Sequence, residues 1–259
     1  MVCLKERLRN GEVLVGSWIT LAHPAIAEIM ARAGFDWLTI DLEHSVITIR
    51  EAEELIRVIE LCGVAPLVRV SANDPVQIKR VMDAGAHGVI VPMVNTPGEA
   101  ADAVAAVQYP PAGRRGVGLA RAQGYGTGFR PYLEWLRADA VVIVQVEHVD
   151  AVNCLEDILS LPGVDGYFIG PYDLSASMGL AGEFDHPEMV GVLERIKRAG
   201  EDFGKPGGLH VVEPDTSRLE ECINQGFRFI AYSLDTRMLD NACRTGLLAV
   251  RESGAGREG

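Results

Sequence analysis

The predicted fold is decided by two apolar runs, each ending in an acidic residue: Val141-Val142-Ile143-Val144-Gln145-Val146 before Glu147, and Gly166-Tyr167-Phe168-Ile169-Gly170-Pro171-Tyr172 before Asp173. Short runs rich in Val and Ile are typical of strands that are buried in a parallel sheet. Parallel α/β folds bind their ligands at the carboxyl ends of their strands. Both carboxylates are therefore predicted to lie at that end, where they form a plausible platform for a divalent metal.

Similar runs alternate with helical segments along the rest of the chain. The strand-like runs lie near residues 14–20, 37–43, 65–71, 88–94, 141–147, 166–173, 206–213 and 227–234. The helical segments cover residues 24–33, 51–61, 75–84, 97–107, 149–161, 187–199, 216–224 and 237–250. This alternation predicts a closed parallel (β/α)8 TIM barrel, with a doubly wound open sheet as the alternative.

Length and composition are consistent with one large domain. The chain has 259 residues, of which 48% are hydrophobic, and no break in composition marks a linker. We expect one barrel domain over residues 1–251 and a flexible tail, rich in glycine and charge, over residues 252–259.

Charge and cysteine content argue against several classes of protein. The formal net charge of -12 disfavours nucleic acid and anionic membranes as partners, although a metal and an arginine can reverse the sign locally for an anionic substrate. With no signal-peptide pattern and no apolar run near the ~18 residues of a membrane span, a cytoplasmic protein is expected. The five cysteines are scattered, which argues against structural zinc and a disulfide framework.

Glu147 and Asp173 form the predicted metal site. Hard cations such as Mg²⁺ and Mn²⁺ favour oxygen ligands and often take only one or two carboxylates together with water. Gln145 lies two residues before Glu147, so it points to the same side of the strand and can orient a metal-bound water. The alternative is that both carboxylates only cap helices.

A possible base and a cation follow two other strands. Asp41 and His44 come after the run Trp37-Leu38-Thr39-Ile40, where the carboxylate can fix the tautomer of a proton-transferring histidine. Arg69 follows Pro66-Leu67-Val68, and its planar guanidinium suits a carboxylate or enolate oxygen. A structural role for His44, and an ion pair of Arg69 with Asp41 or Glu43, are the alternatives.

Other segments give weaker signals. Residues 109–130 form a long glycine-rich connection, predicted to be a lid or an oligomer contact, whose arginines are expected in solvent or between subunits. The loops after the last two strands lack the glycines of a phosphate site. Structural roles are expected for His23, His87, His148 and His186, whereas His210 is an intermediate case.

Taken in order, the motifs resemble the HpcH/HpaI family of class II, metal-dependent pyruvate aldolases, which includes 4-hydroxy-2-oxoheptane-1,7-dioate aldolase and 2-dehydro-3-deoxyglucarate aldolase. The resemblance covers roughly residues 14–248. It rests on residues 34–44, 68–70, 85–92, 109–118, 145–147 and 170–175.

This resemblance implies roles for individual residues. Glu147 and Asp173 would hold Mg²⁺, Mn²⁺ or Co²⁺, Arg69 would bind the pyruvate carbonyl oxygen, and His44 with Asp41 would form an acid/base dyad. Gln145 and the backbone around Gly170 and Tyr172 would help to hold pyruvate. The resemblance also implies a hexamer, a trimer of dimers, whose last helix is exchanged between subunits.

The expected activity is aldol cleavage or condensation of 4-hydroxy-2-oxoacids, giving pyruvate and an aldehyde. A carbon-carbon bond-forming synthase on the same barrel, resembling citrate synthase or macrophomate synthase members, is the alternative, followed by a non-catalytic binder of small acids. The chain departs from the family pattern at Tyr172 and along residues 207–213, where the aldehyde half of the substrate is expected. The aldehyde is therefore not predicted.

Overall fold

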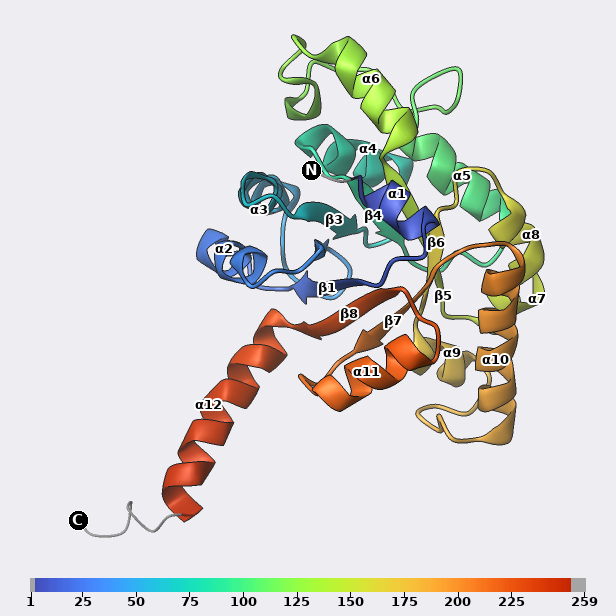
Figure 1. Cartoon of the computed structure of the whole chain (residues 1–259). Helices are drawn as coiled ribbons and strands as arrows, with labels where there is room; N and C mark the ends of the chain where they lie inside the picture. The colour runs from blue at the N-terminus through green and yellow to red at the C-terminus, as the bar shows by residue number, and fades with distance from the viewer. Residues whose placement is uncertain (1–2, 253–259) are drawn as a thin grey trace.

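The computed structural model describes residues 3–252, which form a closed barrel of eight parallel strands in chain order (Figure 1). The strands are β1 (Leu14–Ile19), β2 (Trp37–Asp41), β3 (Ala65–Arg69), β4 (Gly88–Val91), β5 (Val141–Val146), β6 (Gly166–Ile169), β7 (Gly207–Val211) and β8 (Phe229–Leu234). Each strand pairs with the next, and β8 pairs with β1. The predicted barrel is confirmed, and the open sheet is excluded.

The connecting segments are mostly helical. They are α1 (Leu4–Arg9), α2 (Pro24–Arg32), α3 (Ile49–Leu61), α4 (Pro75–Ala84), α5 (Pro97–Val107), the 3-10 turn η1 (Arg121–Gln123), α6 (Phe129–Ala138), α7 (Val149–Asn153), α8 (Leu155–Ser160), α9 (Pro171–Ser177), α10 (Pro187–Asp202), α11 (Thr216–Asn224) and α12 (Asp235–Glu252). The sequence did not predict α1 or α6, and the helix predicted over residues 149–161 is divided at Cys154. Apart from Glu252, the predicted flexible tail lies outside the described residues.

The core has two layers. Inside the barrel, a small cluster stacks Trp37 on Phe229, whose ring centroids are 4.2 Å apart. Phe168 meets Phe229 edge to face. A larger cluster fills the space between the outer faces of the strands and the helices. Because the barrel interior is packed with aromatic rings, chemistry is confined to its two ends.

Helix α1 covers the end of the barrel where the strands begin. Its Leu4 and Leu8 join the inner cluster. Lys5, which is buried, donates a hydrogen bond to the carbonyl of Ala140 just before β5 and forms an ion pair of 3.0 Å with Asp165 just before β6. Glu147 and Asp173 lie beyond the opposite ends of these strands.

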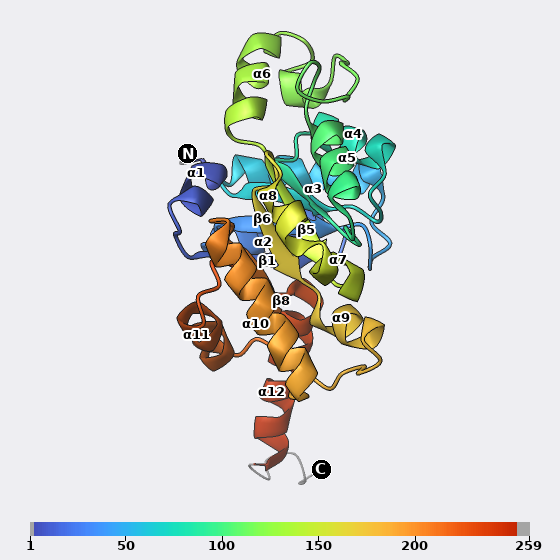
Figure 2. The ribbon, with the colours of Figure 1, turned by 90° about the vertical axis from the view of Figure 1, so that its right-hand side faces the viewer.

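Helix α12 starts at the carboxyl end of β8 and extends away from the barrel in both views (Figure 1 and Figure 2). Its first residue, Asp235, is buried and accepts hydrogen bonds from the backbone N–H groups of Thr20 and Leu21 after β1. Beyond this anchor, Leu239 and Leu247 are exposed. Within residues 3–252, none of the helices combines the length and apolar character needed to cross a membrane.

Candidate active site

Glu147 lies directly after β5 and is almost completely buried, with 3% of its surface exposed. One carboxylate oxygen accepts a 2.7 Å hydrogen bond from the backbone N–H of Met93, and the other accepts one from the side-chain amide of Gln145. Burial raises the pKa of Glu147, and the nearby charges of Glu43 and Asp173 raise it further. The remaining amide oxygen, Oε1 of Gln145, is buried without a hydrogen-bond partner in the described part of the chain.

Gly170, directly after β6, is the first residue on that side of the site. A Cβ atom at this position would lie 2.8 Å from both Cβ and Oε2 of Glu147, so any side chain there would collide with the carboxylate. Pro171 then starts α9, and Asp173 lies exposed in its first turn. Because Asp173 acts on the pKa of both Glu43 and Glu147, the three carboxylates share one electrostatic environment.

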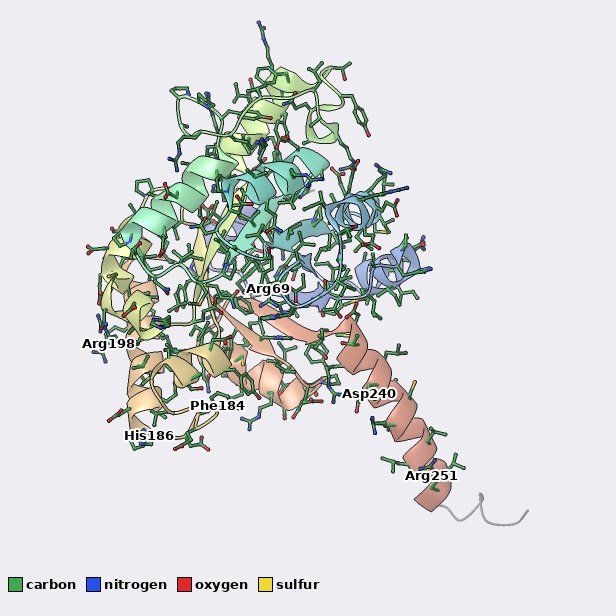
Figure 3. The ribbon with its side chains drawn as sticks, turned by 180° about the vertical axis from the view of Figure 1, so that it is seen from behind. Arg69, Phe184, His186, Arg198, Asp240 and Arg251 are labelled. Atoms are coloured by element: carbon green, nitrogen blue, oxygen red, sulfur yellow. The ribbon has the colours of Figure 1, made fainter. Side chains whose placement is uncertain are left out.

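Arg69, the last residue of β3, lies near the centre of the molecule (Figure 3). Asp41 is opposite it in the β2–β3 register, and the two side chains form a bidentate pair with N–O distances of 2.9 and 2.7 Å. The guanidinium carbon lies 4.3 Å from the centre of the Trp18 ring. The ion pair that the sequence offered as an alternative role for Arg69 is thus present.

Glu43 is the fourth carboxylate of the site, after Glu147, Asp173 and Asp41. Its Oε2 lies 3.2 Å from Nη1 of Arg69, but the contact lacks hydrogen-bond geometry, and this buried oxygen has no hydrogen-bond partner among residues 3–252. Burial raises the pKa of Glu43, Asp41 and Asp173 add to this effect, and Arg69 opposes it. Glu43 was predicted only as a possible partner of Arg69, although its place between Asp41 and His44 was a signal.

His44 lies at the edge of the site, with 67% of its side chain exposed. Its Nε2 is 3.8 Å from the carboxylate of Glu43. Both oxygens of Asp41 are occupied by Arg69, and one also accepts from the backbone N–H groups of Glu43 and His44. The predicted dyad of His44 and Asp41 therefore stays a prediction, since the structure pairs Asp41 with Arg69.

The backbone and the ring of Tyr172 make different contacts. Its carbonyl accepts a hydrogen bond from the hydroxyl of Ser175 within α9. The exposed ring packs edge to face on Phe184, with centroids 4.8 Å apart. The side chain thus lies toward the loop before α10, and the predicted contact of its backbone with pyruvate stays a prediction.

The oxygen ligands available at this end of the barrel fit a divalent cation. The carboxylates of Glu147, Asp173 and Glu43 are close enough to influence one another electrostatically, and the free oxygen of Gln145 adds an acceptor for a coordinated water. No group of three or more His, Cys, Asp and Glu side chains within residues 3–252 has the arrangement of a metal cluster. The predicted site needs only two carboxylates, because water and substrate complete the coordination.

The other histidines divide as the sequence indicated. His23, His148 and His186 accept hydrogen bonds through Nδ1 at the starts of α2, α7 and α10, which are structural roles. His210, near the end of β7, lies instead inside the barrel mouth, with its ring centroid 5.8 Å from that of Trp18. Trp18 was not among the predicted site residues.

The connection over residues 109–130 lies away from this site. Arg115 has no exposed side-chain surface and lies 4.2 Å from the centre of the Tyr109 ring, so its predicted position in solvent or between subunits is wrong. Arg121 donates to the carbonyl of Ala84 and pairs with Glu60. These contacts hold the segment against α3 and α4.

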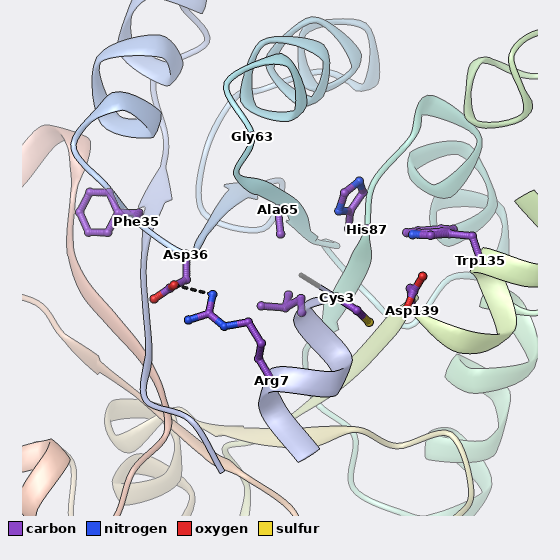
Figure 4. A pocket seen from close by; sticks show the side chains of 10 residues that line it. Cys3, Arg7, Phe35, Asp36, Gly63, Ala65, His87, Trp135 and Asp139 are labelled. Carbon is purple, nitrogen blue, oxygen red and sulfur yellow. Dashed lines mark hydrogen bonds and ion pairs between the residues drawn. The ribbon is translucent and has the colours of Figure 1, made fainter. Parts of the chain in front are cut away.

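A hollow of about 520 Å³ lies at the opposite end of the barrel (Figure 4). Four of its lining residues pair with one another: Arg7 binds Asp36 at 2.7 Å, and the side chain of Cys3 interacts with Asp139. The hollow is bounded by α1 and by residues next to the starts of β2 and β3. It is therefore separate from the carboxylate site.

A closed (β/α)8 barrel that gathers carboxylates and an arginine at the carboxyl ends of its strands is typical of a barrel enzyme. The family model described as HpcH/HpaI aldolase/citrate lyase matches residues 14–242. The chain belongs to the HpcH/HpaI aldolase/citrate lyase family.

Similar proteins cover nearly the whole chain. A hydroxypyruvate/pyruvate aldolase of Sagittula stellata is 41% identical over 249 residues, which are 95% of each chain. A 4-hydroxy-2-oxo-heptane-1,7-dioate aldolase of Salmonella paratyphi C is 42% identical over 91% of this chain and 89% of the relative. A crystal structure of a family member from Burkholderia cenocepacia is 39% identical, with a TM-score of 0.90 over 96% of this chain and 98% of the other.

Proposed function

We propose that this family member is a class II pyruvate aldolase, which reversibly cleaves 4-hydroxy-2-oxoacids to pyruvate and an aldehyde with Mg²⁺, Mn²⁺ or Co²⁺ as cofactor. The observation that carries the proposal is the buried Glu147 carboxylate beside Glu43 and Asp173, with Arg69 as the neighbouring cation. Like charges that share a buried site raise each other's pKa, and a bound cation relieves this repulsion.

The chain's own residues hold the substrate in this proposal. Glu147 and Asp173 hold the cation, and Gln145 and the backbone at Gly170 bind the pyruvate half. Arg69 directs an N–H group at the carbonyl oxygen, and its pair with Asp41 fixes the plane of the guanidinium. A bound divalent cation supplies Lewis-acid stabilisation for the charge that develops on the substrate oxygen.

His44 takes the proton of the 4-hydroxyl group. As that proton leaves, the C3–C4 bond breaks, the former C4 becomes the aldehyde carbonyl carbon and the electron pair stays on the pyruvate half. C3 then takes up a proton to form the methyl group of pyruvate. The exposure of His44 and its contact with Glu43 support this role, since the ring can exchange its proton with solvent.

The active form is a homo-oligomer, a hexamer built as a trimer of dimers, in which α12 packs on a second subunit. The projection of α12 from its own barrel and its exposed Leu239, Leu247 and Leu248 support this arrangement, which the family resemblance also implies. Light scattering on the purified protein tests this proposal, because it measures whether the molar mass is that of six chains.

The activity is tested by incubating the protein with pyruvate in deuterated water, with and without Mn²⁺. We expect exchange of the methyl protons only with metal, followed by consumption of pyruvate when aldehydes are added. Metal-independent exchange contradicts the class II assignment. A synthase is favoured if the methyl protons of pyruvate exchange and pyruvate condenses with oxoacids, but pyruvate adds to none of a panel of aldehydes.

A further inference from the structure

The side chain of His210 points into the barrel mouth from β7. Gly208 lies two residues earlier, and a Cβ there would meet the rings of Phe168 and Phe229, which belong to the inner cluster. Since strand residues two apart share a face, His210 faces the same interior one layer nearer the carboxyl end. Its 5.8 Å ring contact with Trp18 agrees with this position.

One ring nitrogen of His210 is fixed by the backbone. Its Nε2 lies 3.0 Å from the carbonyl of Ser233, and because a carbonyl only accepts, Nε2 carries the hydrogen. Ser233 is itself held: its backbone has a φ of 53°, its hydroxyl donates to the carbonyl of Val212, and Ser17 donates to its carbonyl. The tautomer of His210 is therefore determined by the fold.

The other ring nitrogen is left as an acceptor. Within the described chain, Nδ1 of His210 has no hydrogen-bond partner. Burial lowers the pKa of His210 to about 4, and the charge of Arg69 contributes to the shift. At neutral pH the ring is thus uncharged and offers a lone pair at Nδ1.

This acceptor lies beside the reacting groups. Arg69 and His210 both contact the ring of Trp18, Arg69 at 4.3 Å from its centre and His210 at 5.8 Å between centroids. Pyruvate occupies the β3, β5 and β6 side in the proposed function, which leaves the β7 and β8 side for the aldehyde. On that side, the basic residue Arg237 is already bound by Glu213 and Asp240.

We propose that His210 selects the aldehyde, because its Nδ1 accepts a hydrogen bond from a hydroxyl group next to the aldehyde carbon. The preferred partners are neutral hydroxyaldehydes, and in the cleavage direction the same hydroxyl is on C5 of the oxoacid. The inference rests on the proposed function and names the substrate class of that site. Alkyl aldehydes of equal size leave Nδ1 without a partner, which disfavours them.

The test compares glycolaldehyde with propanal, in which a methyl group replaces the hydroxyl. The quantity measured is the ratio of kcat/KM values for addition of pyruvate to the two aldehydes, which cancels any general loss of activity. Wild-type protein should prefer glycolaldehyde, and His210→Leu should lower this ratio by about tenfold, the effect of one lost hydrogen bond. His210→Asn, which retains a polar acceptor, should keep part of the preference, and the matched control Val212→Ala should keep all of it.

Three results overturn the inference. A wild-type ratio near one shows that no group binds the hydroxyl. Unchanged kcat/KM values for both aldehydes in His210→Leu show that another residue binds it. Equal losses with both aldehydes in His210→Leu assign His210 a structural role. Exchange of pyruvate protons in the same preparations separates these results from failure of the proposed function, because absence of metal-dependent exchange in wild-type protein overturns both proposals.

Discussion

The two ends of the barrel each contain a buried ion pair, but they differ in what surrounds it. At the end where the strands begin, Lys5 is satisfied by Asp165 and by the carbonyl of Ala140. At the carboxyl end, Asp41 satisfies Arg69, yet buried oxygens of Glu43 and Gln145 have no hydrogen-bond partner among residues 3–252. Folded proteins pair nearly all buried polar groups, so these two unpaired oxygens agree with a ligand at the carboxyl end.

Charge shows the same difference. Burial raises the pKa of Asp165 at one end and of Glu147 at the other. The shift of Asp165 is opposed by a lysine in contact with it, whereas that of Glu147 is increased by two more carboxylates. A perturbed carboxylate therefore indicates function here only when its neighbours repel it.

Glu147→Gln should have the largest effect, because it keeps the size of the side chain and removes the charge that holds the cation. We expect loss of metal-dependent proton exchange from pyruvate and weaker binding of Mn²⁺ in electron paramagnetic resonance titrations. The matched control is Asp165→Asn at the other end, which should leave the affinity for Mn²⁺ unchanged. Full activity of Glu147→Gln in the presence of a chelator would exclude the metal site.

His44→Ala should slow aldol cleavage by roughly 10² to 10⁴, the usual contribution of a general acid or base. Decarboxylation of oxaloacetate needs no removal of a hydroxyl proton and should be affected much less. The measurement is the ratio of the two rates at fixed metal concentration, with His23→Ala, a helix-capping histidine, as control. If both rates fall together, His44 only positions ligands.

Arg69→Lys keeps the positive charge and loses the planar fork that Asp41 holds. Turnover should fall by ~10², similar to the loss of one preorganised donor to a developing oxyanion. Steady-state kinetics with pyruvate and one aldehyde measures the change, and Arg7→Lys at the opposite end is the control. Unchanged turnover would reduce Arg69 to a structural partner of Asp41.

Lys5→Met should affect stability and not turnover. It leaves the buried carboxylate of Asp165 without its cation, so the free energy of unfolding in urea should fall by about 3 kcal/mol. The double variant Lys5→Met, Asp165→Asn should recover part of this loss because no buried charge remains. A change in kcat of the single variant would contradict the separation of the two ends.

The strands could be predicted from sequence because each is a short apolar run, as residues 141–146 show. Helix α1 could not be predicted, because its six residues make too few turns to show a helical period. Its Lys5 is also buried, which is unusual for a lysine. The division of residues 149–161 at Cys154 also had no clear signal. The strand ends that carry Glu147 and Arg69 were placed correctly because strand order follows chain order.

The partners within the site were harder to predict than its position. Sequence proximity joined Asp41 to His44, three residues away, whereas the register of β2 with β3 places Asp41 opposite Arg69. Pairing across strands depends on register, which local sequence does not contain. In the same way, the tautomer of His210 depends on Ser233, which lies on another strand.

The anchor that Asp235 forms with Thr20 and Leu21 also affects the order of events during synthesis. It joins two segments that are 215 residues apart, and β1 reaches its second neighbour only when β8 is available. Until the ribosome has released β8, β1 is an open edge that can pair with another chain. Contacts of such long range slow folding, so closure of the barrel is expected to be a late step whose delay favours aggregation of the nascent chain.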